Sequence, residues 1–263
     1  MVGDVTITDL TDDHRRLVAL QRLLLPAQIP PVGCTEVAAG YMSHNDELRL
    51  GGDWYDLVDR PDDQVVAIVG DVVGHGIEQI GVMGQLRAAA NALARSCAEP
   101  HAVLEHLATF ARDTPGAAMA SVIVLMLDGS NVGRVASAGH PPLLHVRPNG
   151  DWQTIDAGRR PPLTLAHERS TGTFTYAVDD LLVLYTDGLV ERREHTWGDR
   201  LERLARRVID KAHDPCARIR DDLIDDAAND IQDDVALMVL RPRNHRAPDH
   251  LLLRADLPDV RIA

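Results

Sequence analysis

Segments that predict strands and segments that predict helices follow one another in blocks along this chain of 263 residues. After one N-terminal helical segment, apolar runs typical of strands precede a pair of helical segments; more strands, a second helix pair and a last strand then follow. A doubly wound parallel sheet needs a strict alternation of strand and helix, which this order does not show. We therefore expect an α+β fold, with mainly antiparallel strands in two layers and helix pairs outside them.

The individual elements are predicted from the period of their apolar residues and from the turn residues that bound them. The predicted strands are 36–41, 54–58, 65–69, 121–127, 133–138, 143–146, 173–177, 181–185 and 235–240. The predicted helices are 11–25, 76–95, 102–112, 200–211 and 215–227. We divide the chain into an N-terminal linker helix at 1–30, one domain at 31–240 and a basic C-terminal tail at 241–263.

Charge and composition exclude several classes of protein. The chain has 27 Lys and Arg against 40 Asp and Glu, so its formal net charge is −13, and only 3% of its residues are aromatic. An acidic surface repels phosphate backbones and anionic lipids, so we expect neither a nucleic-acid partner nor a membrane partner. Three dispersed cysteines and the absence of a signal sequence or a long apolar run indicate a cytoplasmic protein. Carboxylates that converge would instead attract divalent cations.

Aspartates stand beside glycines where predicted strands begin or end. They occur as Gly51-Gly52-Asp53, Gly70-Asp71, Asp187-Gly188 and, without the glycine, Asp233-Asp234. Each pair taken singly is also typical of an ordinary turn. Carboxylates that converge from separate strand ends, however, make the oxygen-rich site that Mg²⁺ or Mn²⁺ prefers. Two such ions close together can activate water for attack on phosphorus.

With their neighbours, these aspartates belong to five segments in a fixed order: GGDWYD at 51–56, GDVVGHG at 70–76, AGHPPLL at 138–144, LYTDGLVE at 184–191 and DDVAL at 233–237. The set strongly resembles the PP2C (PPM) superfamily of metal-dependent serine/threonine phosphatases. It resembles in particular the bacterial branch of sporulation stage II and stress-response phosphatases, which act in partner switching. The likeness extends over about residues 17–240. It implies a sandwich of two mainly antiparallel sheets flanked by helix pairs, and a phosphatase domain at 31–240.

The resemblance also implies a centre of two Mn²⁺ or Mg²⁺ ions. Asp71 resembles the carboxylate that bridges both metals, and Val72 would offer its backbone carbonyl. Asp187 and Asp233 resemble ligands of one metal, and Asp53 resembles the carboxylate that holds metal-bound water. Two further aspartates, Asp56 and Asp234, are weaker candidates. If a strand begins at Asp233-Asp234, only one of the two can face the metals, because successive side chains alternate.

The function that follows from the resemblance is hydrolysis of phosphoserine or phosphothreonine by metal-activated water, with Asp53 and Asp71 as catalytic residues. The implied substrate and partner is a phosphorylated STAS-type regulatory protein, an anti-sigma-factor antagonist. The family also forms homodimers, which are a further expected association. The alternative hypothesis is a catalytically weak domain of the same fold that binds a regulatory partner without turnover.

Some positions depart from the eukaryotic relatives or have competing interpretations. Val73 occupies the position of a histidine thought to protonate the leaving group. His75 and His140 are more typical of turn and packing residues than of catalytic ones, and no phosphate-binding arginine has an evident counterpart. The helix after Gly76 contains Gly81 and Gly84, which lower helix propensity and are typical of close packing between helix and sheet. The alternative, implied by the resemblance, is a regulatory switch helix that controls Asp71.

Overall fold

The structure is a computed structural model that describes residues 23–30, 32–43, 51–61, 63–74, 76–166, 168–190, 196–228 and 233–243. Its strands are β1 (Thr35–Met42), β2 (Trp54–Arg60), β3 (Gln64–Asp71), β4 (Ser121–Leu127), β5 (Val132–Ala138), β6 (Leu143–Val146), β7 (Trp152–Ile155), β8 (Arg159–Arg160), β9 (Gly172–Thr175), β10 (Leu181–Tyr185) and β11 (Val235–Pro242). Its helices are α2 (Ile77–Ser96), α3 (Pro100–Arg112), α4 (Trp197–Asp210) and α5 (Cys216–Ala228), with a 3₁₀ turn η1 (Asp187–Leu189).

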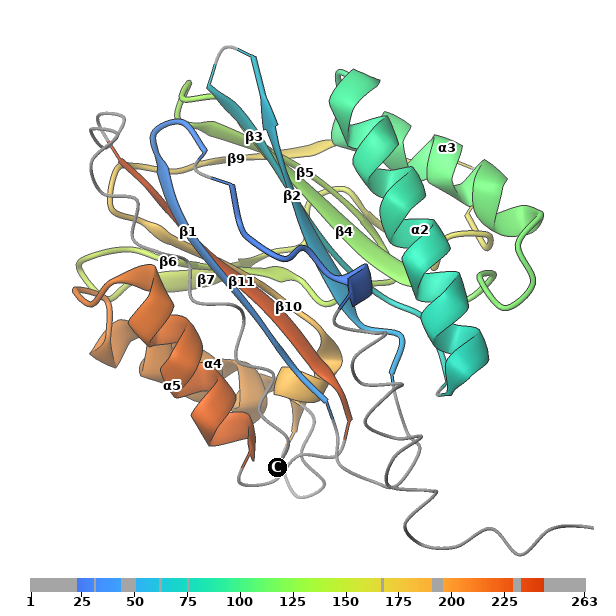
Figure 1. The fold of residues 1–263 in the computed structure, drawn as a ribbon. Helices are drawn as coiled ribbons and strands as arrows, with labels where there is room; N and C mark the ends of the chain where they lie inside the picture. The colour runs from blue at the N-terminus through green and yellow to red at the C-terminus, as the bar shows by residue number, and fades with distance from the viewer. Residues whose placement is uncertain are drawn as a thin grey trace, which may run out of the picture.

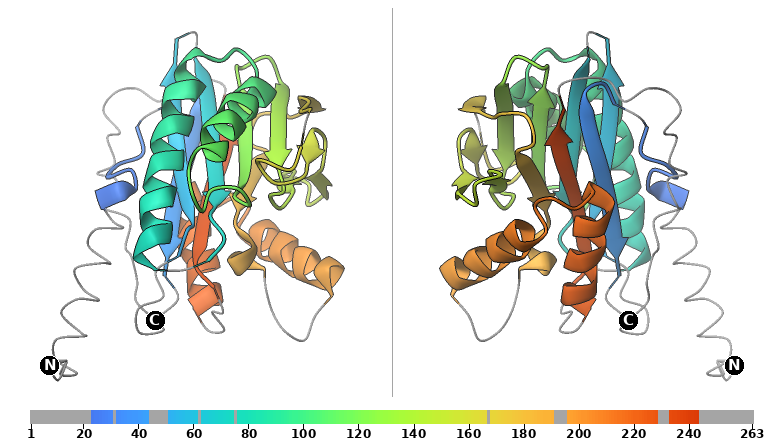
Figure 2. Two further views of the ribbon diagram at one scale, coloured as in Figure 1. Left: turned by 90° about the vertical axis from the view of Figure 1, so that its right-hand side faces the viewer. Right: turned by 90° about the vertical axis from the view of Figure 1, so that its left-hand side faces the viewer.

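The strands form two sheets that face one another (Figure 1). One sheet has the order β1-β11-β10-β6-β7; the other has the order β2-β3-β4-β5-β8, and β9 pairs with β5. Among the pairings that the structure describes, β5 with β8 is parallel and the rest are antiparallel. The helix pair α2 and α3 packs on the second sheet, and α4 and α5 pack on the first (Figure 2). The predicted α+β sandwich with outer helix pairs is confirmed.

The alternation of side chains along β11 shows how one strand serves two cores. Ala236, Met238 and Leu240 point into the core between the sheets, which continues beneath α2 and α3. The intervening Val235, Leu237 and Val239 point into a second core beneath α4 and α5. A strand with both faces buried is apolar without a break, and 235–240 was predicted as a strand from that run.

Two strands were missed by the sequence analysis because they carry almost no apolar signal. Only Ile155 of β7 is buried, and both residues of β8 are exposed. One predicted strand is longer in the structure than in the prediction: β11 continues to Pro242, two residues beyond the predicted end. There the buried Arg241 donates hydrogen bonds to the carbonyls of Ala212 (2.8 Å) and Asp214 (2.7 Å).

The predicted N-terminal helix at 11–25 lies mostly outside the described residues, although its Leu23 and Leu24 are helical. Most of the predicted tail, from residue 244 onward, also lies outside them. In the ranges that are described, no helix combines the length and the apolar character needed to span a bilayer.

Candidate metal and active site

The strands β2 and β3 bring Asp53 and Asp71 together. Trp54 pairs with Gly70, and this antiparallel register places Asp53, just before β2, opposite Asp71 at the end of β3. The backbone contact continues one step further, because Val72 N donates to Gly52 O at 3.2 Å. Two carboxylates eighteen residues apart in the sequence therefore share one edge of the sheet.

The facing sheet contributes its aspartates from the ends of β10 and β11. Asp187 opens η1 directly after β10, and Asp233 and Asp234 directly precede β11. Thr186 fixes this junction: its N donates to Ala236 O (2.9 Å), and its Oγ1 accepts from Ala236 N (2.8 Å). The two strands therefore present their aspartates at one end of the same antiparallel pair.

The structure gives Asp233 and Asp234 different surroundings. Asp234 is buried, and its Oδ2 accepts hydrogen bonds from the Tyr41 hydroxyl and from Gly51 N, the latter at 2.7 Å. Asp233 is exposed, and its Oδ1 accepts from Asp234 N at 2.8 Å. Asp234 thus ties β1 and the Gly51 segment to β11, whereas Asp233 lies toward solvent, as the alternation of side chains predicts.

The carboxyl groups of the two sheets lie close enough to perturb one another. Burial, followed by the charges of Asp71 and Asp234, raises the pKa of Asp53 well above its usual value. Burial and the charge of Asp187 are the leading causes that raise the pKa of Asp71 to about 7, and Asp233 adds to them. Like charges held together in a poorly solvated place disfavour ionisation, so this cluster is a place where a cation would relieve repulsion.

The donor groups fit a hard divalent cation, although they are not closed around one point. Over the described ranges, no three His, Cys, Asp or Glu side chains are arranged as a ligand set. Asp53 Oδ2, however, is buried without a hydrogen-bond partner. A buried, unpartnered carboxylate oxygen among further carboxylates suits Mg²⁺ or Mn²⁺, which take oxygen ligands.

Glycines bring backbone oxygens against the cluster. A Cβ placed on Gly52 would lie 2.2 Å from Val72 O, and a Cβ on Gly188 would lie 2.0 Å from Asp234 O. Any larger residue at either position would therefore displace the neighbouring backbone. Gly52 in particular allows Val72, whose carbonyl was predicted as a metal ligand, to pack beside Asp53.

Asp56 does not join the cluster. Asp53 and Asp56 are three residues apart at the start of β2, so their side chains leave opposite faces of the strand. Asp56 is buried beneath α2, where its Oδ2 accepts a hydrogen bond from Arg87 Nη1 at 2.8 Å. Spacing alone could have separated the two aspartates, but the partner on α2 was not evident in the sequence.

Of the two histidines considered in the sequence, His75 lies outside the described residues. His140 is fully buried, and its Nδ1 is 2.8 Å from Ser121 Oγ. Burial lowers the pKa of His140 to about 3, so the imidazole is neutral near pH 7. This favours the packing role over a role as proton donor. Val73 is exposed next to the cluster.

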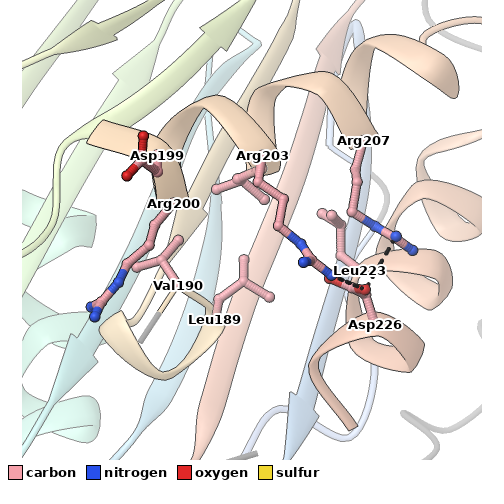
Figure 3. Close-up of a pocket in the computed structure, with 9 residues that line it drawn as sticks. Leu189, Val190, Asp199, Arg200, Arg203, Arg207, Leu223 and Asp226 are labelled. Carbon is pink, nitrogen blue, oxygen red and sulfur yellow. Dashed lines mark hydrogen bonds and ion pairs between the residues drawn. The ribbon is translucent and has the colours of Figure 1, made fainter. Parts of the chain in front are cut away.

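A groove that was not predicted from the sequence lies where the end of η1 meets α4 and α5 (Figure 3). Leu189 and Val190, from the turn that Asp187 opens, form part of its wall, and its volume is about 170 Å³. Arg203 and Arg207 reach across it to Asp226 of α5, at 2.9 and 3.1 Å. The charges of these arginines are therefore paired within the fold, and the ion pairs connect α4 to α5. In the sequence, the four-residue spacing of Arg203 and Arg207, which places both on one face of a helix, could have indicated this contact.

A family model described as "Stage II sporulation protein E (SpoIIE)" matches residues 61–243 of the chain. The match includes Asp71, Asp187 and Asp233, and it begins after Asp53 and Asp56.

Several solved structures have the same fold. The RsbU and RsbW domains of Rv1364c from Mycobacterium tuberculosis are 29% identical, with a TM-score of 0.78 over 86% of this chain and 64% of that one. The PP2C domain of SpoIIE from Bacillus subtilis, solved with a fragment of its regulatory domain, is 14% identical, with a TM-score of 0.71 over 82% and 64%. The SiaA-PP2C domain of Pseudomonas aeruginosa is 20% identical, with a TM-score of 0.72 over 89% and 97%. The chain therefore spans less than two thirds of the first two structures.

Proposed function

The chain belongs to the stage II sporulation protein E family of PP2C-type phosphatase domains, and from this premise we propose that it is a Mn²⁺- or Mg²⁺-dependent protein serine/threonine phosphatase. The observation that carries the proposal is the convergence of carboxylates from both sheets, with the buried Asp53 Oδ2 unpartnered among them. A cluster that repels itself without a cation is costly to the fold, and such a cost is typical of functional sites.

Each residue of the cluster has a distinct part in the proposal. Asp71, the Val72 carbonyl, Asp187 and Asp233 would hold two Mn²⁺ or Mg²⁺ ions, and Asp53 would orient the attacking water. When bound, the ions supply positive charge against the phosphoryl group and make water a better nucleophile. Asp234, already engaged by Tyr41 and Gly51, would keep the ends of β1 and β11 in place.

We propose as substrate a phosphorylated STAS-type regulatory protein, dephosphorylated in the cytoplasm. Support comes from the Mycobacterium tuberculosis relative, whose structure contains an RsbU domain together with an RsbW domain. That pairing fits a phosphatase that works within partner switching. The acidic chain, at −13, also fits a protein substrate better than a nucleic acid.

The test is release of inorganic phosphate from a phosphoserine STAS protein, with Mn²⁺ and with EDTA, beside hydrolysis of p-nitrophenyl phosphate. We expect both reactions to require Mn²⁺. Hydrolysis of p-nitrophenyl phosphate without release of phosphate from the STAS protein would support the proposed phosphatase activity and contradict the proposed substrate. If a folded protein catalyses neither reaction, the result would favour the alternative, a partner-binding domain with little turnover. Val73 in place of a proton-donating histidine is also consistent with that alternative.

A further inference from the structure

We propose that the partly buried ion pair between Asp56 and Arg87 is a positioning device that fixes α2 on β2 and thereby holds the Asp53–Asp71 edge in the arrangement that binds metal. The inference rests on the proposed function and assigns a role to the second aspartate of the 51–56 segment. Asp56 and Arg87 are positioning residues in this proposal, since neither lies among the clustered carboxylates.

The pair is a directional contact at an interface to which α2 contributes mainly apolar side chains, and Asn91 of the same helix adds a second hydrogen bond to Asp56. The residues of α2 buried against the sheet and α3 are Ile80, Val82, Met83, Leu86, Ala90 and Ala94. Arg87 lies in the middle of this helix with its side chain 22% exposed, and Asp56 opposite it is 4% exposed. Apolar packing tolerates small slides of a helix, whereas a charged hydrogen bond of 2.8 Å specifies one register.

Both ends of the contact lead directly to the carboxylate cluster. Asp56 belongs to β2, and Asp53 stands immediately before the first residue of that strand. Arg87 belongs to α2, which follows Asp71 after a connection of only five residues, 72–76. Figure 1 shows α2 lying along β2, and the helix and the strand are in contact. A slide of α2 would therefore pull on the connection that carries Val72.

The first residue of this connection, Val72, is held tightly against the segment before β2. Val72 is fully buried, donates to Gly52 O at 3.2 Å, and packs its own carbonyl where a Cβ on Gly52 would lie 2.2 Å away. This Gly52–Val72 contact lies one residue beyond Asp53 and Asp71 along the two strands. Any shift of Val72 would thus be passed to the two carboxylates through the tightly packed Gly52–Val72 contact.

The experiment measures Mn²⁺ binding to the substrate-free protein by isothermal titration calorimetry, with thermal unfolding recorded in parallel. Asp56→Asn keeps the size of the side chain and removes the charge that holds Arg87. We expect it to weaken Mn²⁺ binding about tenfold at a temperature where the protein is fully folded. Arg87→Lys retains the positive charge without the planar guanidinium, and we expect an intermediate loss. This milder variant also decides the question if Asp56→Asn fails to fold.

The matched control is Asp180→Asn. Asp180 is also buried and paired: its Oδ2 lies 2.6 Å from His145 Nε2 and accepts from Ala177 N at 2.9 Å. It precedes β10 whereas Asp187 follows that strand, so roughly 20 Å of strand separates it from the cluster. We expect Asp180→Asn to lower the melting temperature and leave Mn²⁺ binding unchanged.

The possible outcomes separate the inference from the function on which it rests. Wild-type protein that binds no Mn²⁺ would overturn the proposed metal-dependent function and the inference together. Wild-type binding that Asp56→Asn and Arg87→Lys leave intact would overturn the inference alone. Equal weakening by Asp180→Asn would also overturn it, because the effect would then be one of general stability.

Discussion

Asp53 and Asp71 lie opposite one another at the end of the β2–β3 ladder, one step beyond the Trp54–Gly70 pair. Burial is the leading cause that raises the pKa of both carboxyl groups; the charge of Asp71 raises the pKa of Asp53 further, whereas a hydrogen bond with Asp53 lowers the pKa of Asp71. The facing sheet adds Asp187, Asp233 and Asp234 to the same end of the sandwich. A fold stabilised by two aliphatic cores thus carries an electrostatic strain at one edge.

The metal-free protein should lose stability as the pH rises. Asp71 has a folded-state pKa of about 7, above its value of about 4 in an unfolded chain. Between these values the unfolded state releases its proton while the folded state keeps it, so the free energy of unfolding falls from pH 4 to pH 7. Asp71→Asn removes this contribution. In EDTA, we expect its melting temperature to exceed that of the wild type by more at pH 7.5 than at pH 5.

An equal difference at both pH values would contradict the assigned strain at Asp71. Added Mn²⁺ provides the complementary measurement, because it should raise the melting temperature of the wild type and do so less in Asp71→Asn.

Gly52→Ala should damage the site through the backbone. The added Cβ would stand 2.2 Å from the Val72 carbonyl oxygen, so the junction between the two strand ends must open. We expect a destabilisation of about 1–3 kcal/mol together with a loss of Mn²⁺ binding. Calorimetric Mn²⁺ titration with a parallel urea melt checks both effects, and wild-type binding in the variant would be evidence against the packing described.

The glycines of α2 distinguish packing from switching. A Cβ on Gly81 meets nothing within 4 Å, so Gly81→Ala should stabilise the protein by about 0.5–1 kcal/mol through helix propensity alone. A Cβ on Gly84 meets the Leu24 side chain at 3.2 Å, so in Gly84→Ala the Leu24 side chain must give by a few tenths of an ångström. If α2 is a switch helix, Gly84→Ala changes phosphatase activity without an equal loss of stability.

Unfolding by urea and phosphate release, measured on the same preparations, separate these cases. Parallel losses of activity and stability in Gly84→Ala would support plain helix packing instead.

The strands that could be predicted from the sequence were those whose buried side chains form an apolar run. The run 235–240 is apolar on both faces and was identified, whereas β7 and β8 expose nearly all their residues and were not. The start of α4 was placed three residues late, because Trp197 begins the helix behind a Thr196–Asp199 capping box rather than behind an apolar residue.

The positions of the candidate site residues along the strands were predictable, but their arrangement in space was not. The strand-end position of Asp53, Asp71 and Asp187 followed from the sequence, since each borders a strong strand. The partner of Asp56 did not, because Arg87 is thirty-one residues away and only the packing of α2 on β2 brings them together. Nor could the sequence decide between Asp233 and Asp234, since that depends on Tyr41 and Gly51.

The central claim, that Asp71 is the carboxylate on which metal-dependent hydrolysis depends, is tested most directly by phosphate release from a phosphoserine STAS protein in Mn²⁺. Wild type and Asp71→Asn are compared at equal concentrations of folded protein. We predict that the wild type releases phosphate and that Asp71→Asn, although at least as stable in EDTA, is slower by about a hundredfold or more. Release by Asp71→Asn at the rate of the wild type would contradict the account.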